Sequence, residues 1–101
     1  MWLFTLFDLP VDTKQARRNY AIFRKKLLSD GFVRIQYSVY ARVCASEEAV
    51  AVHVRRIEAN IPPDGEVRLL WITDKQFGRQ KIFWGKKRKQ PPKPLQQLEF
   101  F

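Results

Sequence analysis

Two helix-like segments with the same spacing of apolar residues, each lying between strand-like segments, constrain the fold of this chain more than any other feature. Both carry apolar residues at i, i+4, i+7 and i+11, starting from Ala16 and Val50, which are 34 residues apart. That spacing makes one face of each helix apolar. Two successive βαβ units of this size are typical of a ferredoxin-like βαββαβ fold. The sequence therefore predicts an α+β domain with both helices on one face of an antiparallel sheet.

The strand-like segments are rich in β-branched and aromatic residues. They cover residues 2–9, residues 32–45 (as one bent strand or two short ones), residues 66–73 and residues 80–84. The last segment predicts an extra C-terminal strand, and we expect a turn from Thr73 to Arg79 before it.

Helix boundaries can also be predicted. Asp12 or Thr13 is the expected N-cap of the first helix, and Ser46 that of the second. Gly31 is the expected left-handed residue after the first helix.

Residues 2–9 would place apolar side chains on both faces of a strand. Leu3, Thr5, Phe7 and Leu9 lie on one face; Trp2, Phe4, Leu6 and Asp8 lie on the other. Only one face can pack against the helices, and apolar patches of this size are seldom left exposed to water. The simplest cover is a second copy of the chain, so the sequence predicts a sheet-to-sheet homodimer.

The charge balance indicates a polyanionic partner. The chain has 101 residues, enough for one domain, and carries 19 basic against 10 acidic residues, a net charge of +9. Nucleic acid is the expected partner ahead of a membrane surface. The alternative is a solvated basic surface with no specific partner.

The sequence predicts a cytoplasmic protein. No Lys or Arg precedes Lys14, and Asp8 interrupts the apolar run, so no signal peptide is expected. No segment approaches the roughly 20 apolar residues of a membrane helix. The single cysteine, Cys44, suits a reducing compartment, and we interpret it as a small buried hydrophobe rather than a nucleophile.

The chain divides into a domain over residues 1–84 and a basic, proline-containing tail over residues 85–101. Basic residues on the first helix and in the tail are the expected phosphate contacts, which position a nucleic acid without reading its bases. They are Lys14, Arg17, Arg18, Lys25, Lys86, Lys87, Arg88 and Lys89.

Asp8 is the one isolated carboxylate at the tip of a buried strand. It could be a turn residue that accepts hydrogen bonds from the amides of residues 12–14. It could equally be functional, although one aspartate makes a poor metal site, because Mg²⁺ usually takes one or two carboxylates plus water or phosphate oxygens. A twofold dimer would supply a second copy.

Three motifs resemble a known family. FDLP after the first strand, the basic helix QARRNYAIFRKKLLSDGF and the segment QYSVYAR are similar to the small CRISPR-associated Cas2 family. These are the endoribonuclease-type proteins that accompany the CRISPR integrase. The resemblance covers residues 1–84, and FRKKLLSDGF resembles most the members from systems with a Cas9-type effector.

The resemblance implies a ferredoxin-like homodimer in which the last strand, here residues 80–84, extends the partner's sheet. It implies that Asp8 faces its twin across the dimer, binds a divalent metal (Mg²⁺ or Mn²⁺) and supports cleavage of RNA or DNA. Ser38 is the expected polar group nearby, although a solvent-facing strand position is the commoner fate of such a serine. Phe7 and Leu9 lack the hydroxyl that the family often has beside this aspartate.

The resemblance also implies a role in spacer acquisition, in which the dimer bridges integrase dimers and holds a double-stranded DNA protospacer. Two alternatives remain open: a stand-alone toxin-type ribonuclease of the same fold, and a non-catalytic RNA- or DNA-binding module. The last is weakest for an RNA-recognition sheet, because the chain lacks the aromatic motif of such sheets.

Overall fold

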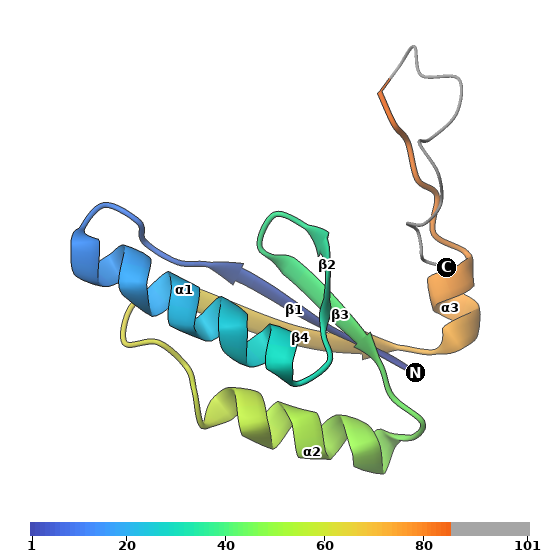
Figure 1. The fold of residues 1–101 in the computed structure, drawn as a ribbon. Helices are drawn as coiled ribbons and strands as arrows, with labels where there is room; N and C mark the ends of the chain where they lie inside the picture. Colours follow the sequence, from blue (N-terminus) through green and yellow to red (C-terminus); the bar gives the residue numbers. More distant parts are fainter. Residues whose placement is uncertain (86–101) are drawn as a thin grey trace.

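The computed structural model describes residues 1–85 of the chain, which form a four-stranded antiparallel sheet with two long helices on one face (Figure 1). The strand order is β2-β3-β1-β4. The elements along the chain are β1 (Trp2–Asp8), α1 (Lys14–Ser29), β2 (Val33–Gln36), β3 (Val39–Val43), α2 (Glu47–Glu58), β4 (Glu66–Ile72) and α3 (Asp74–Gly78). This order confirms the predicted ferredoxin-like βαββαβ fold. Within the described part, no helix has the length and apolar character needed to cross a membrane.

The core lies between the sheet and the two long helices. Leu3 and Phe7 of β1 are buried there, and Phe7 meets Phe23 of α1 edge-on with ring centroids 5.2 Å apart. Tyr40 of β3 lies under the same helix, with its ring 5.6 Å from that of Phe7. Such aromatic pairs bury large apolar areas and also restrict how the layers pack. The Leu3/Phe7 face of β1 is therefore the one that the helices cover.

The helix boundaries follow the predicted capping residues. Thr13, rather than Asp12, caps α1, because its hydroxyl accepts a hydrogen bond of 2.9 Å from the Ala16 amide. Ser46 caps α2 in the same way, because its hydroxyl accepts a hydrogen bond from the Ala49 amide. Gly31 has φ of +87°, as expected for the left-handed residue after α1.

The apolar stripe of α2 is shorter than predicted. The helix ends at Glu58, so Ile61 lies beyond it and is 47% exposed rather than part of the stripe. The buried face instead includes His53, between Val50 and Ile57. A histidine can be buried here because its ring is hydrogen-bonded to the Asp30 carboxylate, at 2.7 Å.

The prediction for residues 73–84 also needs correction. The expected turn contains α3, which begins with a capping box between Thr73 and Gln76. The structure has no strand over residues 80–84, where the sequence predicted an extra C-terminal strand. A strand needs a neighbouring edge to bond with, and α3 leads the chain away from the sheet (Figure 1). The predicted phosphate contacts Lys86, Lys87, Arg88 and Lys89 lie outside the described residues.

Candidate metal site and nucleic-acid surfaces

Asp8 is the last residue of β1 and is exposed on the sheet face opposite α1 and α2. Within residues 1–85 its carboxylate makes no hydrogen bond or ion pair. In particular, it does not accept from the amides of residues 12–14, where Thr13 caps the helix instead. The turn interpretation of Asp8 therefore loses its main support, and the carboxylate is available to a ligand.

The backbone around Asp8 is held by β4. The two strands are paired from Trp2, opposite Ile72, to Asp8, opposite Glu66. Gly65 precedes β4 with φ of +96°, and a Cβ atom there would lie 2.7 Å from the Asp8 carbonyl oxygen. The close approach of this glycine fixes the end of β1, and with it the position of the carboxylate.

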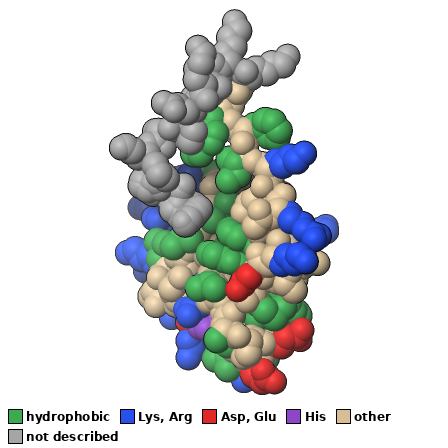
Figure 2. Space-filling view, turned by 90° about the vertical axis from the view of Figure 1, so that its right-hand side faces the viewer, with side chains coloured by type: hydrophobic (Ala, Val, Ile, Leu, Met, Phe, Trp, Pro, Cys, Tyr) green, Lys and Arg blue, Asp and Glu red, His purple; other side chains and the backbone are tan. Residues whose placement is uncertain are grey.

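The sheet face that carries Asp8 is largely apolar. Val33, Val43 and Leu70 are 54%, 52% and 45% exposed there, and Phe4 is half-buried. Figure 2 shows hydrophobic side chains down the middle of the side of the molecule that carries α3, with Lys and Arg side chains beside them.

The helix α3 covers one end of this apolar face. Phe77 stacks on Trp2 with ring centroids 4.1 Å apart. The rest of the face has no covering element within residues 1–85, and an exposed patch of this kind is typical of a protein interface.

The donors near Asp8 fit a hard divalent cation only in part. Asp8 and Glu66 are opposite each other on neighbouring strands, but Glu66 is paired with Arg68. The described residues contain no group of three or more His, Cys, Asp or Glu side chains that could hold a metal. One chain thus offers Asp8 as a free carboxylate, and Mg²⁺ or Mn²⁺ would need a second Asp8, water or phosphate oxygens. Sequence reasoning missed Glu66 and Arg68, because only the β1–β4 register brings them to Asp8.

Ser38 lies beside β1, although its hydroxyl does not face Asp8. Its carbonyl oxygen accepts from the Phe7 amide at 3.1 Å, while its hydroxyl shares a hydrogen bond of 3.0 Å with the Tyr20 hydroxyl of α1. The residue sits at φ of +65° in the turn between β2 and β3, which are two short strands. In this arrangement Ser38 orients the hairpin against the residue before Asp8.

The predicted basic residues of α1 are exposed, but they lie on the other side of the sheet from Asp8. Lys14, Arg18 and Lys25 point away from the core, since α1 buries Phe23 on its inner face. Arg17 differs, because its guanidinium donates to the Val11 carbonyl oxygen at 3.0 Å. The structure therefore separates the outer basic face of α1 from the Asp8 carboxylate.

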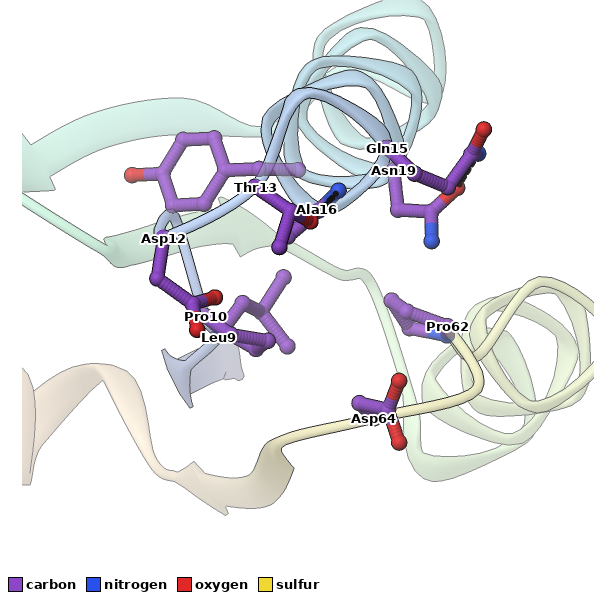
Figure 3. Close-up of a pocket in the computed structure, with 10 residues that line it drawn as sticks. Leu9, Pro10, Asp12, Thr13, Gln15, Ala16, Asn19, Pro62 and Asp64 are labelled. Carbon is purple, nitrogen blue, oxygen red and sulfur yellow. Dashed lines mark hydrogen bonds between the residues drawn. The ribbon is translucent and has the colours of Figure 1, made fainter.

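A cavity of about 480 Å³ opens just beyond Asp8, starting at Leu9. Figure 3 shows it between the start of α1 and the segment before β4, with Asp12 and Asp64 at its sides. These carboxylates would repel a phosphate group, and Asp8 does not line the cavity. The cavity is thus not an extension of a phosphate site at Asp8.

A partly buried polar cluster at the far end of α1 was not predicted. Asp30 accepts from His53 at 2.7 Å and from Arg56 at 2.6 Å, and its carbonyl oxygen accepts from Arg42. Burial raises the pKa of Asp30, but the hydrogen bonds and charges of His53 and Arg56 outweigh it, so the pKa lies below the usual value. The partners are far apart in sequence, so no local pattern signals the cluster. Cys44 is buried, as expected.

Comparison with known proteins gives consistent results. The model of the family described as CRISPR associated protein Cas2 matches residues 1–80. A protein of Parvibaculum lavamentivorans named CRISPR-associated endoribonuclease Cas2 is 55% identical over 101 residues, which is 100% of both chains. A protein of the same name from Flavobacterium psychrophilum is 48% identical over 101 residues, covering 100% of this chain and 88% of the relative.

A crystal structure of Streptococcus pyogenes Cas2 at pH 6.5 has the same fold. It superposes with a TM-score of 0.61, covering 82% of this chain and 99% of that one, at 20% sequence identity. Because the family model matches residues 1–80 and a relative is 55% identical over the whole of both chains, the protein belongs to the CRISPR-associated Cas2 family.

Proposed function

We propose that the chain is a metal-dependent endonuclease subunit of the CRISPR spacer-acquisition complex, acting in the cytoplasm as a homodimer. The observation that carries the proposal is the Asp8 carboxylate, which has no partner among residues 1–85 and lies at the end of an apolar sheet face that these residues leave largely uncovered. A second copy packed on that face would hide the apolar residues and bring a second Asp8 to the same seam.

Two Asp8 carboxylates at the seam would resist joint ionisation, and a cation between them would relieve the repulsion. Two Asp8 carboxylates would give Mg²⁺ or Mn²⁺ part of its oxygen ligands, and water and phosphate oxygens would complete the coordination. When bound, such an ion polarises a phosphodiester and activates water. Ser38 would contribute indirectly, by holding the hairpin beside Phe7.

The DNA-binding role is assigned to a different surface. Lys14, Arg18 and Lys25 on α1, with Arg17 at its edge, would hold a DNA duplex through phosphate contacts, and the basic tail would add to them. This separation is consistent with a dimer that bridges two integrase dimers while it holds a protospacer. Nuclease activity and duplex binding would then be independent properties.

The experiment that tests the site is the Asp8→Asn variant. We expect it to lose Mg²⁺ binding, measured by calorimetry, and to lose cleavage of single-stranded RNA and duplex DNA, while its circular dichroism stays unchanged. Asp64→Asn, which alters another exposed carboxylate, is the matched control. Cleavage by purified Asp8→Asn at the parental rate would refute the assignment of Asp8.

A stand-alone ribonuclease is the second candidate, because the relatives are named endoribonucleases. Co-expression with a CRISPR integrase separates the two functions. Co-purification of the two proteins supports the acquisition complex; RNA cleavage without any complex supports the ribonuclease.

A further inference from the structure

Two charged residues of β4 share the open sheet face with Asp8. Glu66 lies directly opposite Asp8, and Arg68 lies opposite Leu6. Because side chains alternate along a strand, all three charged side chains project from the same face. Two carboxylates opposite each other on neighbouring strands repel, so this arrangement needs a compensating charge.

Arg68 supplies that charge with a defined geometry. Its Nε and Nη2 atoms donate to the two oxygens of Glu66, each at 3.1 Å. The hydrogen bonds and the charge of Arg68 lower the pKa of Glu66, and Glu66 in turn raises the pKa of Arg68. Glu66 is therefore held in its ionised form with its charge balanced by Arg68, whereas Asp8 has no such partner among residues 1–85.

The paired guanidinium still has donors to offer. An arginine side chain has five N–H groups, and the bidentate contact uses two of them. The Nη1 end and the second Nη2 hydrogen remain for a ligand. The spacing of these N–H groups at the end of the planar guanidinium matches two oxygens of a phosphate group. Glu66 already limits the orientations that the guanidinium can adopt.

We propose that Arg68, oriented by Glu66, binds a phosphate of the nucleic-acid strand at the Asp8 site. The proposal rests on the proposed nuclease function, and it names the residue that holds the substrate there. Asp8 repels a polyanion when no cation is bound, and the N–H groups of Arg68 that Glu66 leaves free would offer the phosphate oxygens hydrogen-bond donors beside the carboxylate. Arg68 is a substrate-binding residue in this assignment, and Glu66 is a positioning residue.

The proposal is tested by RNA binding in the Asp8→Asn background, where no cleavage occurs. The probe is a short fluorescent single-stranded RNA, titrated across a salt series without divalent metal. Arg68→Ala should weaken binding about tenfold, the cost of removing a charge-assisted hydrogen bond. The slope of log affinity against log salt should fall by about 0.7 for each phosphate that the variant no longer neutralises.

Three further variants sharpen the test. Arg68→Lys should recover part of the affinity, because it keeps the positive charge but loses the paired donors of the guanidinium. Glu66→Gln should weaken binding less than Arg68→Ala, since it removes only the orienting partner. Arg55→Ala, on α2 across the sheet, is the matched control and should leave binding within about twofold, as expected of a residue outside the interface.

The activity of the parental enzyme provides a separate readout. Arg68→Ala alone should raise KM. Its Mg²⁺ affinity should not fall, because every metal ligand remains in place and the variant removes a nearby positive charge. RNA binding unchanged in Arg68→Ala would overturn the proposal and leave the role of Asp8 intact. Conversion of the dimer to a monomer by Arg68→Ala would also overturn it, by making Arg68 a subunit contact. Unimpaired cleavage by Asp8→Asn would instead refute the proposed function itself.

Discussion

At the scale of single residues, Asp30 joins elements that are distant in sequence. The residue follows α1, and its carboxylate accepts hydrogen bonds from His53 and Arg56 of α2. Arg42 of β3 donates to its carbonyl oxygen. Its side chain is 15% exposed, so the charge depends on these donors rather than on water. The cluster anchors the end of α1 to α2 and the sheet.

We predict that Asp30→Asn lowers the free energy of unfolding by about 2 kcal/mol at pH 7, as for a hydrogen-bonded buried charge. Because folding lowers the pKa of Asp30, its stabilisation is complete above the usual value of 3.8 and disappears as the pH falls through the folded pKa. The difference between parent and variant should therefore shrink at acidic pH.

Urea titrations at pH 7 and pH 3, at one fixed chain concentration, measure this change. Asp64→Asn alters an exposed carboxylate that has no hydrogen bond within residues 1–85, and it should change stability by less than about 0.5 kcal/mol. An equal deficit of Asp30→Asn at both pH values would contradict the account of the cluster.

At the scale of secondary-structure elements, the β1–β4 pair sets the site. The strands are paired along their whole lengths, and Gly65 turns the chain into β4 against the Asp8 backbone. A side chain at this glycine would meet both the Asp8 carbonyl oxygen and the Leu9 side chain at 2.7 Å. The turn therefore positions Asp8 as well as starting the strand.

Gly65→Ala should destabilise the fold by about 1–3 kcal/mol, from its positive φ and the close backbone contact. Gly78→Ala is the matched control, because a Cβ there meets nothing within 4 Å and φ is not positive. Thermal unfolding of the two variants measures the difference. Equal melting temperatures would show that the segment before β4 relaxes freely.

The elements that the sequence predicted well are those whose signals are local. Thr13, Ser46 and Gly31 each mark a helix end by short-range hydrogen bonding or backbone geometry, and all three lie where expected. Ile61 was misassigned because it has the spacing of the apolar stripe but lies beyond the end of α2. His53 was missed because its partner, Asp30, lies 23 residues away.

The segment after β4 shows a second limit. Residues 80–84 include Ile82, Phe83 and Trp84 and have strand propensity, yet they form no strand in the single chain. The outer edge of β4 is unpaired within residues 1–85. Propensity alone cannot say whether such a segment pairs with its own sheet, with another chain or with neither.

At the scale of the whole molecule, two surfaces lie on opposite sides of the sheet. One is the outer face of α1, with Lys14, Arg18 and Lys25; the other is the apolar face that ends at Asp8. The sequence singled out both sets of residues from composition and strand position. It could not predict that they are separated, since that depends on which face of β1 the helices cover.

Duplex DNA binding should therefore depend on α1 and be independent of Asp8. The logarithm of the affinity should fall linearly with the logarithm of the salt concentration, with a slope of about −0.9 for each phosphate neutralised. The double variant Arg18→Ala/Lys25→Ala should reduce this slope by about one to two units per protomer. Arg17→Ala should have a smaller effect, because its guanidinium is bonded to the Val11 carbonyl.

Fluorescence anisotropy of a mixed-sequence duplex over a salt series measures the slope. Asp8→Asn serves as the control and should leave it unchanged, whereas loss of DNA binding in that variant would place both functions on one surface. A double variant with the parental slope would move the DNA-binding surface off α1.

The central claim is that the sheet face that residues 1–85 leave largely uncovered pairs with a second copy and so brings two Asp8 carboxylates together. Sedimentation equilibrium of the full chain at micromolar concentration tests it most directly. We predict a species of about twice the chain mass of 12.0 kDa. A single species of 12.0 kDa would contradict the account, because Asp8 would then lack its twin and the apolar face its cover.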